Sequence, residues 1–79
     1  MALEKRIVYK QAVMKNNVKL ERARINLGQQ TLAELVGVSR QTIHSIESGK
    51  FSPSCILAIK ISKIFSLKVE EVFILEEID

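Results

Sequence analysis

Residues 29–49, QQTLAELVGVSRQTIHSIESG, contain the pattern that decides the fold. Leu32 lies in a stretch whose apolar residues recur at helical spacing and which stops at Gly37. After that glycine, Ile43 and Ile46 stand three residues apart, as on one face of a second helix. This arrangement predicts two short helices joined by a tight turn.

The residues around the turn fit two helices that pack at a steep angle. Ala33 supplies the small side chain that a close helix approach requires, four residues before Gly37. Gly37 can adopt a positive φ and end the first helix, and Val38 fills the space beneath the turn. Ser39 is a good N-cap for the second helix, which Gly49 ends. The sequence therefore predicts a helix-turn-helix unit.

Three further helices are predicted around this unit, so the fold class is an all-α, compact five-helix domain. Asn17 is the predicted N-cap of the first helix, which Gly28 ends. Pro53-Ser54 begins the fourth helix, and a short fifth helix lies around residues 69–73. The fourth helix is expected to supply core residues Ile56, Leu57, Ile59, Ile61, Ile64 and Phe65.

The two ends of the chain are predicted to differ from this helical body. Residues 1–16 form an N-terminal arm or extension, and residues 17–79 form the helix-turn-helix domain with a C-terminal dimerisation segment. Residues 6–10 are strand-like, whereas residues 12–15 could continue a helix. Residues 73–75 are β-prone and could pair with the arm in a small two-stranded antiparallel sheet.

Charge is distributed unevenly along the chain. The first 69 residues contain all 12 lysines and arginines but only four acidic residues, which gives this segment a net charge of +8. The last ten residues contain the other five acids, Glu70, Glu71, Glu76, Glu77 and Asp79. A basic body suits a polyanionic partner, and the acidic tail should then face away from that partner.

The composition argues against an enzyme, a metal protein and a membrane protein. Cys55 is the only cysteine and His44 the only histidine, so no catalytic set, disulfide or zinc site can be assembled. Cys55 lies in an apolar run, where a small buried thiol is expected. Neither a run of about 18 apolar residues nor an apolar signal core is present. No cofactor is expected, and the cytoplasm is the expected compartment.

Three segments carry a resemblance to a known family: LAELVGVSRQTI at 32–43, IESGK at 46–50, and Pro53-Ser54. Residues 16–73 as a whole resemble the Xre or phage-repressor-type (lambda-repressor-like) helix-turn-helix family. The resemblance implies a five-helix domain whose third helix enters the major groove of DNA. It also implies, for one subgroup, a small antiparallel sheet formed by the two termini. Gly28 departs from the usual Ser or Thr of the family, which removes one hydroxyl from a candidate phosphate contact.

The outer side of the third helix carries the predicted base-contacting residues. Arg40 and Gln41 lie at its N-terminus, the end that enters the groove. Arginine can make a bidentate pair with guanine, and glutamine can make one with adenine. Thr42 and Ser45 complete the predicted readout, and Ser45 matches a base-contacting place in the family. His44 belongs to the same set as an exposed polar residue beside the groove.

Phosphate contacts are predicted on either side of these residues. Gln29 opens the second helix, where backbone N–H groups and the helix dipole favour an anion. Ser39 at the next N-cap and Lys50 just past Gly49 extend the set along the DNA backbone, and the resemblance supports Gln29 and Lys50. Such contacts fix register and affinity but do not read sequence.

One structural ion pair is implied by the resemblance. Glu47 follows the buried-looking Ile46 and should need a cationic partner. The family pairs the matching glutamate with an arginine of the first helix, and Arg22 lies at the corresponding place. This pair is predicted to lock the first helix to the third.

These observations predict a sequence-specific regulator of transcription, most simply a repressor, that binds double-stranded DNA as a homodimer on a palindromic operator. The last helix and the tail carry more apolar surface than so short a segment is expected to bury against its own core. The predicted dimer interface consists of Val69, Val72, Phe73, Ile74 and Leu75.

A second function stays open from the sequence. The chain could be an antitoxin, a protein-interaction module that binds a toxin partner and regulates its own operon, with residues 1–16 as the partner-binding arm. RNA binding is weaker, because the interleaved aromatic residues that stack on single-stranded bases are absent.

Overall fold

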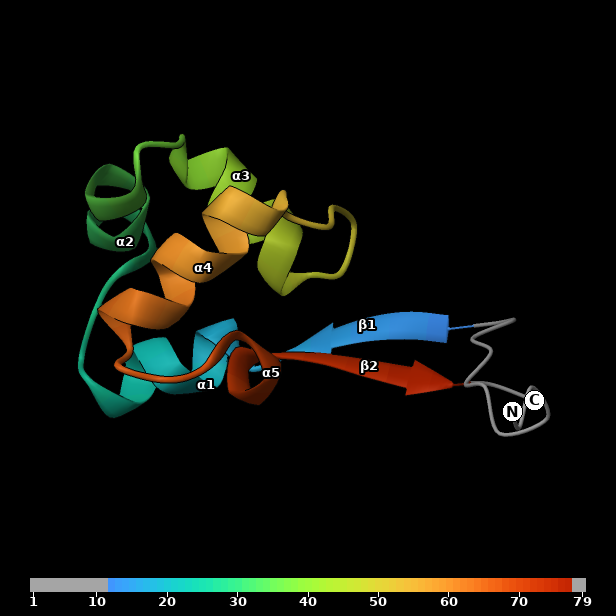
Figure 1. Cartoon of the computed structure of the whole chain (residues 1–79). Helices are drawn as coiled ribbons and strands as arrows, with labels where there is room; N and C mark the ends of the chain where they lie inside the picture. The colour runs from blue at the N-terminus through green and yellow to red at the C-terminus, as the bar shows by residue number, and fades with distance from the viewer. Residues whose placement is uncertain (1–11, 78–79) are drawn as a thin grey trace, which may run out of the picture.

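The computed structural model describes residues 12–77 and contains, within them, five helices and two strands. In chain order the elements are β1 (Ala12–Asn16), α1 (Val18–Arg24), α2 (Gln29–Val36), α3 (Arg40–Glu47), α4 (Cys55–Ile64), α5 (Val69–Val72) and β2 (Phe73–Glu77). The helices form one body, and the two strands project from it as a narrow ribbon (Figure 1). The predicted five-helix domain and its small antiparallel sheet are confirmed.

The hydrophobic core lies where α2, α3 and α4 meet. Leu32 from α2, Ile43 from α3 and Ile61 from α4 are each fully buried. Ala33 is also fully buried, as expected for the small residue at the close approach of α2 and α3. Burial of each large aliphatic side chain contributes about 1.5–3 kcal/mol relative to leaving it exposed. These contacts therefore fix the angle between the two helices of the helix-turn-helix unit.

Local signals define the ends of the central helices. Gly37 ends α2 with φ +81°, a left-handed conformation that glycine adopts without steric cost. The hydroxyl of Ser39 accepts the backbone N–H of Thr42 at 3.1 Å, and the hydroxyl of Ser54 accepts that of Leu57 at 3.1 Å. Both serines are therefore true N-caps, of α3 and α4 respectively.

The start of α1 differs from the predicted cap. Asn17 occupies the N-cap position, but its side chain makes no capping hydrogen bond. The side-chain oxygen of Asn16 instead accepts the backbone N–H of Val18 at 3.2 Å. The amide of Asn16 donates to the carbonyl of Ile46 at 2.9 Å, and that of Asn17 donates to the carbonyl of Glu71 at 3.3 Å. The two asparagines thus tie β1 and α1 to α3 and α5.

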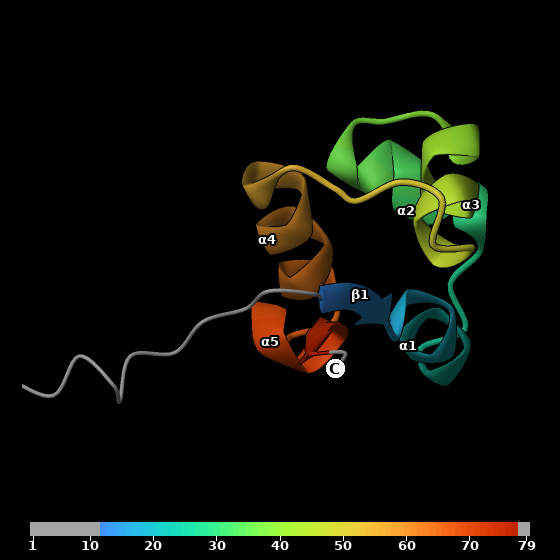
Figure 2. The same ribbon diagram turned by 90° about the vertical axis from the view of Figure 1, so that its right-hand side faces the viewer.

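The ribbon pairs the two ends of the described chain. β1 and β2 are antiparallel, with Met14 opposite Leu75 and Asn16 opposite Phe73. The ribbon leaves the body between α1 and α5 (Figure 2). The alternative of a helix through residues 12–15 is wrong, because these residues find backbone partners in β2. The strand-like segment 6–10, and with it most of the predicted arm, lies outside the described residues.

α4 buries a smaller part of its apolar run than expected. Leu57 and Ile61 belong to the core, but Ile56 is 69% exposed and Ile59 is 39% exposed. Cys55 is exposed as well, so the expectation of a buried thiol is wrong. The reason is geometric: α4 rests on the body along one face, and a continuous apolar run covers more than one face.

The C-terminal segment is also partly different from expectation. Val72 is fully buried and Phe73 is 6% exposed, both within the core of their own chain. Val69 packs partly against the same core. Ile74 and Leu75, which are 37% and 49% exposed, are the members of this segment that keep an apolar surface. The prediction that Val72 and Phe73 lie on a free surface is therefore corrected, because α5 and the start of β2 close the core.

Candidate nucleic-acid interface

α3 presents two chemically different faces. Its inner face buries Ile43 and Ile46 against the core. Its outer face carries the predicted base-contacting residues, of which Arg40, Gln41 and His44 are exposed. The other two, Thr42 and Ser45, are partly exposed. All five predicted residues therefore lie on α3 outside its buried face, with Arg40 and His44 beside one hollow and Thr42 and Ser45 beside another.

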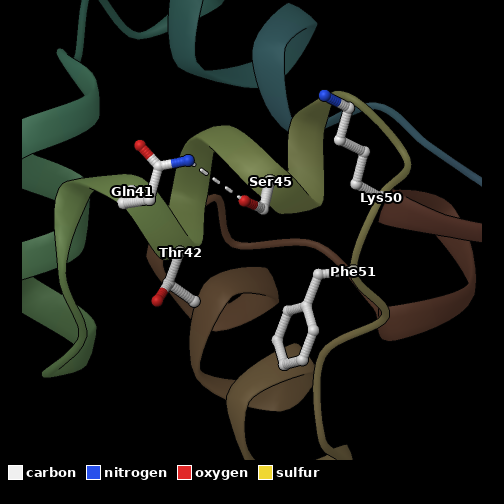
Figure 3. Close-up of a pocket in the computed structure, with 5 residues that line it drawn as sticks. All are labelled: Gln41, Thr42, Ser45, Lys50 and Phe51. Atoms are coloured by element: carbon white, nitrogen blue, oxygen red, sulfur yellow. Dashed lines mark hydrogen bonds between the residues drawn. The ribbon is translucent and has the colours of Figure 1, made fainter.

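Two hollows flank this outer face, and Gln41 borders both. The first, about 460 Å³, is lined by Gln29, Arg40, Gln41 and His44. The second, about 220 Å³, is lined by Gln41, Thr42, Ser45, Lys50 and Phe51 (Figure 3). The amide of Gln41 donates to the hydroxyl of Ser45, one turn further along α3, at 3.4 Å. α3 is thus a ridge with a depression on each side, a shape that suits insertion into a groove.

The predicted ion pair joins α1 to α3. Arg22 Nε lies 2.6 Å from Glu47 Oε2, and Arg22 Nη2 donates to Glu47 Oε1 at 3.1 Å. The side chains are 14% and 5% exposed. Arg22 also donates to the carbonyl of Leu27, and Gln29 Nε2 donates to Glu47 Oε1 at 2.9 Å. A bidentate ion pair between arginine and a carboxylate is stronger than a neutral hydrogen bond, and this pair is also shielded from solvent.

The environment of Glu47 lowers the pKa of its carboxyl group. The largest single effect is burial, which by itself would raise the pKa. The hydrogen bonds from Arg22 and Gln29, together with the positive charges of Arg22 and Lys19, outweigh burial and hold the pKa below its ordinary value. Glu47 is therefore ionised at neutral pH, as the pair with Arg22 requires.

Gln29 connects this ion pair to the readout surface. Its side-chain oxygen accepts Arg40 Nε at 3.4 Å, while its amide nitrogen donates to Glu47. Both ends of the Gln29 side chain are thereby engaged. The first backbone N–H groups of α2, which have no partner within the helix, are the groups left to meet a phosphate here.

The other predicted phosphate contacts lie at the two ends of α3. Ser39 uses its hydroxyl within the protein, as an acceptor for the Thr42 N–H and as a partner of the Thr42 hydroxyl at 3.0 Å. Lys50 is exposed just beyond α3, and its backbone N–H donates to the carbonyl of Ser45 at 2.9 Å. The hydroxyl of Ser39 therefore already takes part in hydrogen bonds within the protein. The exposed side chain of Lys50 can reach a phosphate.

Two further residues border the same surface and were not predicted from the sequence. Lys19 of α1 lines a hollow of about 220 Å³ together with Gln29 and His44. Phe51 lines the hollow beside Ser45 and is 49% exposed. A signal existed for Phe51, since an aromatic residue in the polar loop GKFSPS is unusual in a chain with 5% aromatic residues. Lys19 had none, because a lysine on a short helix is ordinary.

Features of two other classes of protein are absent from residues 12–77. No three His, Cys, Asp or Glu side chains in this range gather as a metal site would require. None of the helices in the same range is long and apolar enough to cross a membrane.

Known proteins resemble this chain in sequence and in fold. The HTH_3 helix-turn-helix family matches residues 18–72. The chain is 56% identical to YgzD of Bacillus subtilis over 64 residues, 81% of this chain and 97% of that protein. It is 55% identical to MJ0272 of Methanocaldococcus jannaschii over the same shares of the two chains. Both relatives are described as uncharacterized HTH-type transcriptional regulators.

Two solved structures have a similar fold. The restriction-modification controller protein C.AhdI from Aeromonas hydrophila matches with a TM-score of 0.65 and 25% identity, over 70% of this chain and 80% of its own. A provisionally assigned DNA-binding protein from Bacteroides fragilis matches with a TM-score of 0.71 and 26% identity, over 77% and 98%. The similarity to helix-turn-helix regulators is consistent with the exposed polar face of α3. The chain belongs to the HTH_3 (Xre/Cro/C1-type) helix-turn-helix family, and it is a DNA-binding regulator of transcription.

Proposed function

We propose that this regulator is a repressor that reads a palindromic operator as a homodimer in the cytoplasm. The observation that carries the proposal is the outer face of α3, where five polar side chains stand free of the core between two hollows. A single domain of this size presents one such helix among its described residues, and one half-site offers few base contacts. Two copies related by a two-fold axis would present two helices about 34 Å apart on one side of the DNA.

Recognition of the bases is assigned to the exposed side chains of α3. Arg40 would pair with guanine O6 and N7, and Gln41 with adenine N6 and N7. Thr42, Ser45 and His44 would meet the neighbouring base edges. The 3.4 Å contact between Arg40 and Gln29 supports this assignment, because it restrains the guanidinium before DNA is bound.

Backbone contacts are assigned to the residues around α3. The N-terminus of α2 at Gln29, the N-cap residue Ser39 and the ammonium of Lys50 would each meet a phosphate. The exposure of Lys50, and its position one residue past the turn that ends α3, support its part in this set. These contacts would supply the salt-dependent share of the affinity.

The dimer interface is assigned to the projecting ribbon. Ile74 and Leu75 keep apolar surface there, and Met14, which pairs with Leu75, is 42% exposed beside them. Val69 is only partly buried against the core and is kept in the proposed interface. The ribbon also carries Glu76, so an interface there would hold C-terminal acids away from the DNA if α3 faces it.

Selection of binding sites from random duplexes tests the proposal. Purified protein should enrich a palindrome whose half-sites are separated by about one helical turn, roughly 10 base pairs. In a reporter strain, the selected site placed over a promoter should lower transcription when the protein is expressed. Recovery of a single unpaired half-site, or a rise in transcription from the same promoter, would contradict the dimeric repressor.

A further inference from the structure

The hollow between α3 and the following loop contains an exposed aromatic ring with no place in the core. Phe51 is 49% exposed and does not belong to the core cluster. Its ring lies on the same side of α3 as Thr42, whereas Lys50 extends away from it (Figure 3). Because about half of the Phe51 side chain remains in contact with water, the protein lacks the stabilisation that its full burial would provide. Single exposed apolar side chains are ordinary on protein surfaces, but this ring lines a hollow that the predicted base-contacting residues also line.

The backbone fixes this ring relative to α3. The N–H groups of Lys50 and Phe51 both donate to the carbonyl of Ser45, at 2.9 Å and 3.2 Å. The loop therefore turns back onto the helix at the residue whose side chain faces the hollow. The backbone of Phe51 is thereby tied to α3, which keeps its side chain beside the hollow.

The side chains that line the hollow include both apolar groups and the amide-bearing side chain of Gln41. The hydroxyl of Thr42 is hydrogen-bonded to Ser39, which leaves the Thr42 methyl group to face the ring of Phe51. Gln41 lines the same hollow, and its amide donates to the hydroxyl of Ser45. At about 220 Å³ the hollow is smaller than the roughly 300–1,000 Å³ of small-molecule sites. It is large enough to admit the edge of one base.

We propose that Phe51 and the methyl group of Thr42 recognise the C5-methyl group of a thymine in the major groove. Thymine is the base that presents an apolar group on that edge, and phenylalanine and the threonine methyl are suitable partners for it. Gln41 would pair with an adjacent adenine, so the hollow selects an A·T-containing step. This proposal rests on the proposed DNA readout and names one specificity determinant within it.

Replacement of single thymines by deoxyuridine tests the proposal, because the change removes one methyl group and leaves base pairing intact. The probes are fluorescent duplexes of the selected site, with a single thymine of one half-site replaced at a time. Wild-type protein should bind one of these duplexes about fourfold more weakly than the parent, the factor expected from burying one methyl group. The other replacements should have little effect.

Variants of Phe51 then assign the effect to the ring. Phe51→Ala should bind the parent duplex more weakly than the wild-type protein does, and its methyl effect should fall well below fourfold, to the part that the Thr42 methyl group supplies. Phe51→Leu should retain part of the methyl effect, and it serves if Phe51→Ala does not fold. Leu20→Ala removes an apolar side chain that is 63% exposed on α1, outside the hollow, and should keep the full fourfold effect.

The outcomes separate the two proposals. If wild-type protein binds no selected duplex more tightly than random DNA, the proposed readout fails. If specific binding is present but Phe51→Ala and Phe51→Leu both retain the wild-type methyl effect, or no replacement has an effect, the assignment of Phe51 is wrong.

Discussion

Gln29 contacts both the ion pair that joins α1 to α3 and a proposed base-reading side chain. One end of its side chain binds Glu47, which is paired with Arg22, and the other end accepts Arg40 at 3.4 Å. An ion pair that locks α1 to α3 therefore also restrains the proposed guanine-reading side chain. A change at Glu47 is expected to affect both stability and DNA binding, although Glu47 itself is not one of the proposed DNA contacts.

The first prediction concerns Glu47 and pH. Its pKa is lower in the folded protein than in the unfolded chain, so its contribution is complete above the unfolded value and is lost as pH falls. The loss should begin near the ordinary glutamate pKa of about 4.3 and continue below it. Glu47→Gln should lower the free energy of unfolding by about 3 kcal/mol at neutral pH, because Arg22 loses its ionised partner.

Urea unfolding at pH 7 and at pH 3 measures this effect. The wild-type protein should lose more stability between the two pH values than Glu47→Gln does. Glu34→Gln is the matched control, since the exposed Glu34 side chain accepts a hydrogen bond from the neutral amide of Gln30. Equal pH dependence of wild-type and Glu47→Gln would show that the pair contributes nothing.

The second prediction separates readout from backbone binding. Arg40→Ala should cost about 1–3 kcal/mol of binding free energy on the selected site and relax the preference at one base position. Lys50→Ala should weaken binding to all sequences alike and flatten the salt dependence by about one unit of slope. Anisotropy titrations at several salt concentrations measure both. An equal loss on specific and random DNA for Arg40→Ala would make Arg40 a phosphate contact instead.

Individual side chains were predictable from sequence where a local rule constrains them. Arg22 and Glu47 followed from the family pattern, and Ser39 from its capping position. Cys55 and Phe51 did not follow, because exposure depends on which elements cover a residue and not on its neighbours in sequence. An apolar setting in the sequence predicted burial for Cys55, but the structure leaves that side of α4 uncovered.

At the scale of elements, the two glycines that bound α2 have opposite roles. Gly28 is an extended N-cap, and no neighbouring group lies within 4 Å of the place that a Cβ would take, so a side chain would fit there. Gly37 has φ +81°, which disfavours any side chain although the space is open. One glycine is therefore replaceable and the other is required by the turn.

The third prediction follows from this contrast. Gly28→Ser should raise stability by about 0.5 kcal/mol, because it restricts the unfolded chain and adds a capping hydroxyl. For a domain of this size that corresponds to a rise of roughly 2–4 °C in Tm. Gly37→Ala, its matched control at the other end of α2, should lower stability by about 1 kcal/mol. Thermal unfolding followed by circular dichroism measures both, and a fall in Tm for Gly28→Ser would contradict the interpretation of Gly28 as an unstrained cap.

Elements differ in how far sequence predicts them. α2, its turn and α3 were predictable because Gly37 and Ser39 encode the helix ends locally. β1 was not, since residues 12–16 become a strand only by pairing with residues 73–77. The start of α4 was predicted from Pro53-Ser54, but its inner face was not, because the run CILAIKI has no clear polar side. Non-local contacts decided each of the elements that sequence left open.

At the scale of the whole molecule, the fourth prediction is the dimer. Sedimentation at micromolar concentration should give about twice the chain mass of 8.9 kDa. Leu75→Glu should lower that mass and weaken binding to the palindrome, because it places a charge in the proposed ribbon interface. Phe73→Glu would be a poor test, since Phe73 is buried and its replacement would disrupt the core.

The control for the dimer is Leu20→Glu. Leu20 is 63% exposed on α1, outside the proposed interface, and its replacement should leave the mass unchanged. Circular dichroism would verify that both variants are folded. A wild-type monomer that binds the palindrome with full affinity would contradict the ribbon interface and leave pairing on the DNA as the explanation.

The antiparallel ribbon also determines how the domain would respond to mechanical force. Its register joins Ala12 to Glu77, so the described chain enters and leaves the domain at the same end of the ribbon. Tension applied there acts across the ladder and loads its hydrogen bonds one after another, as in opening a zipper. The strands would separate at low force, while the close packing of α2 and α3 would resist until the core itself ruptured.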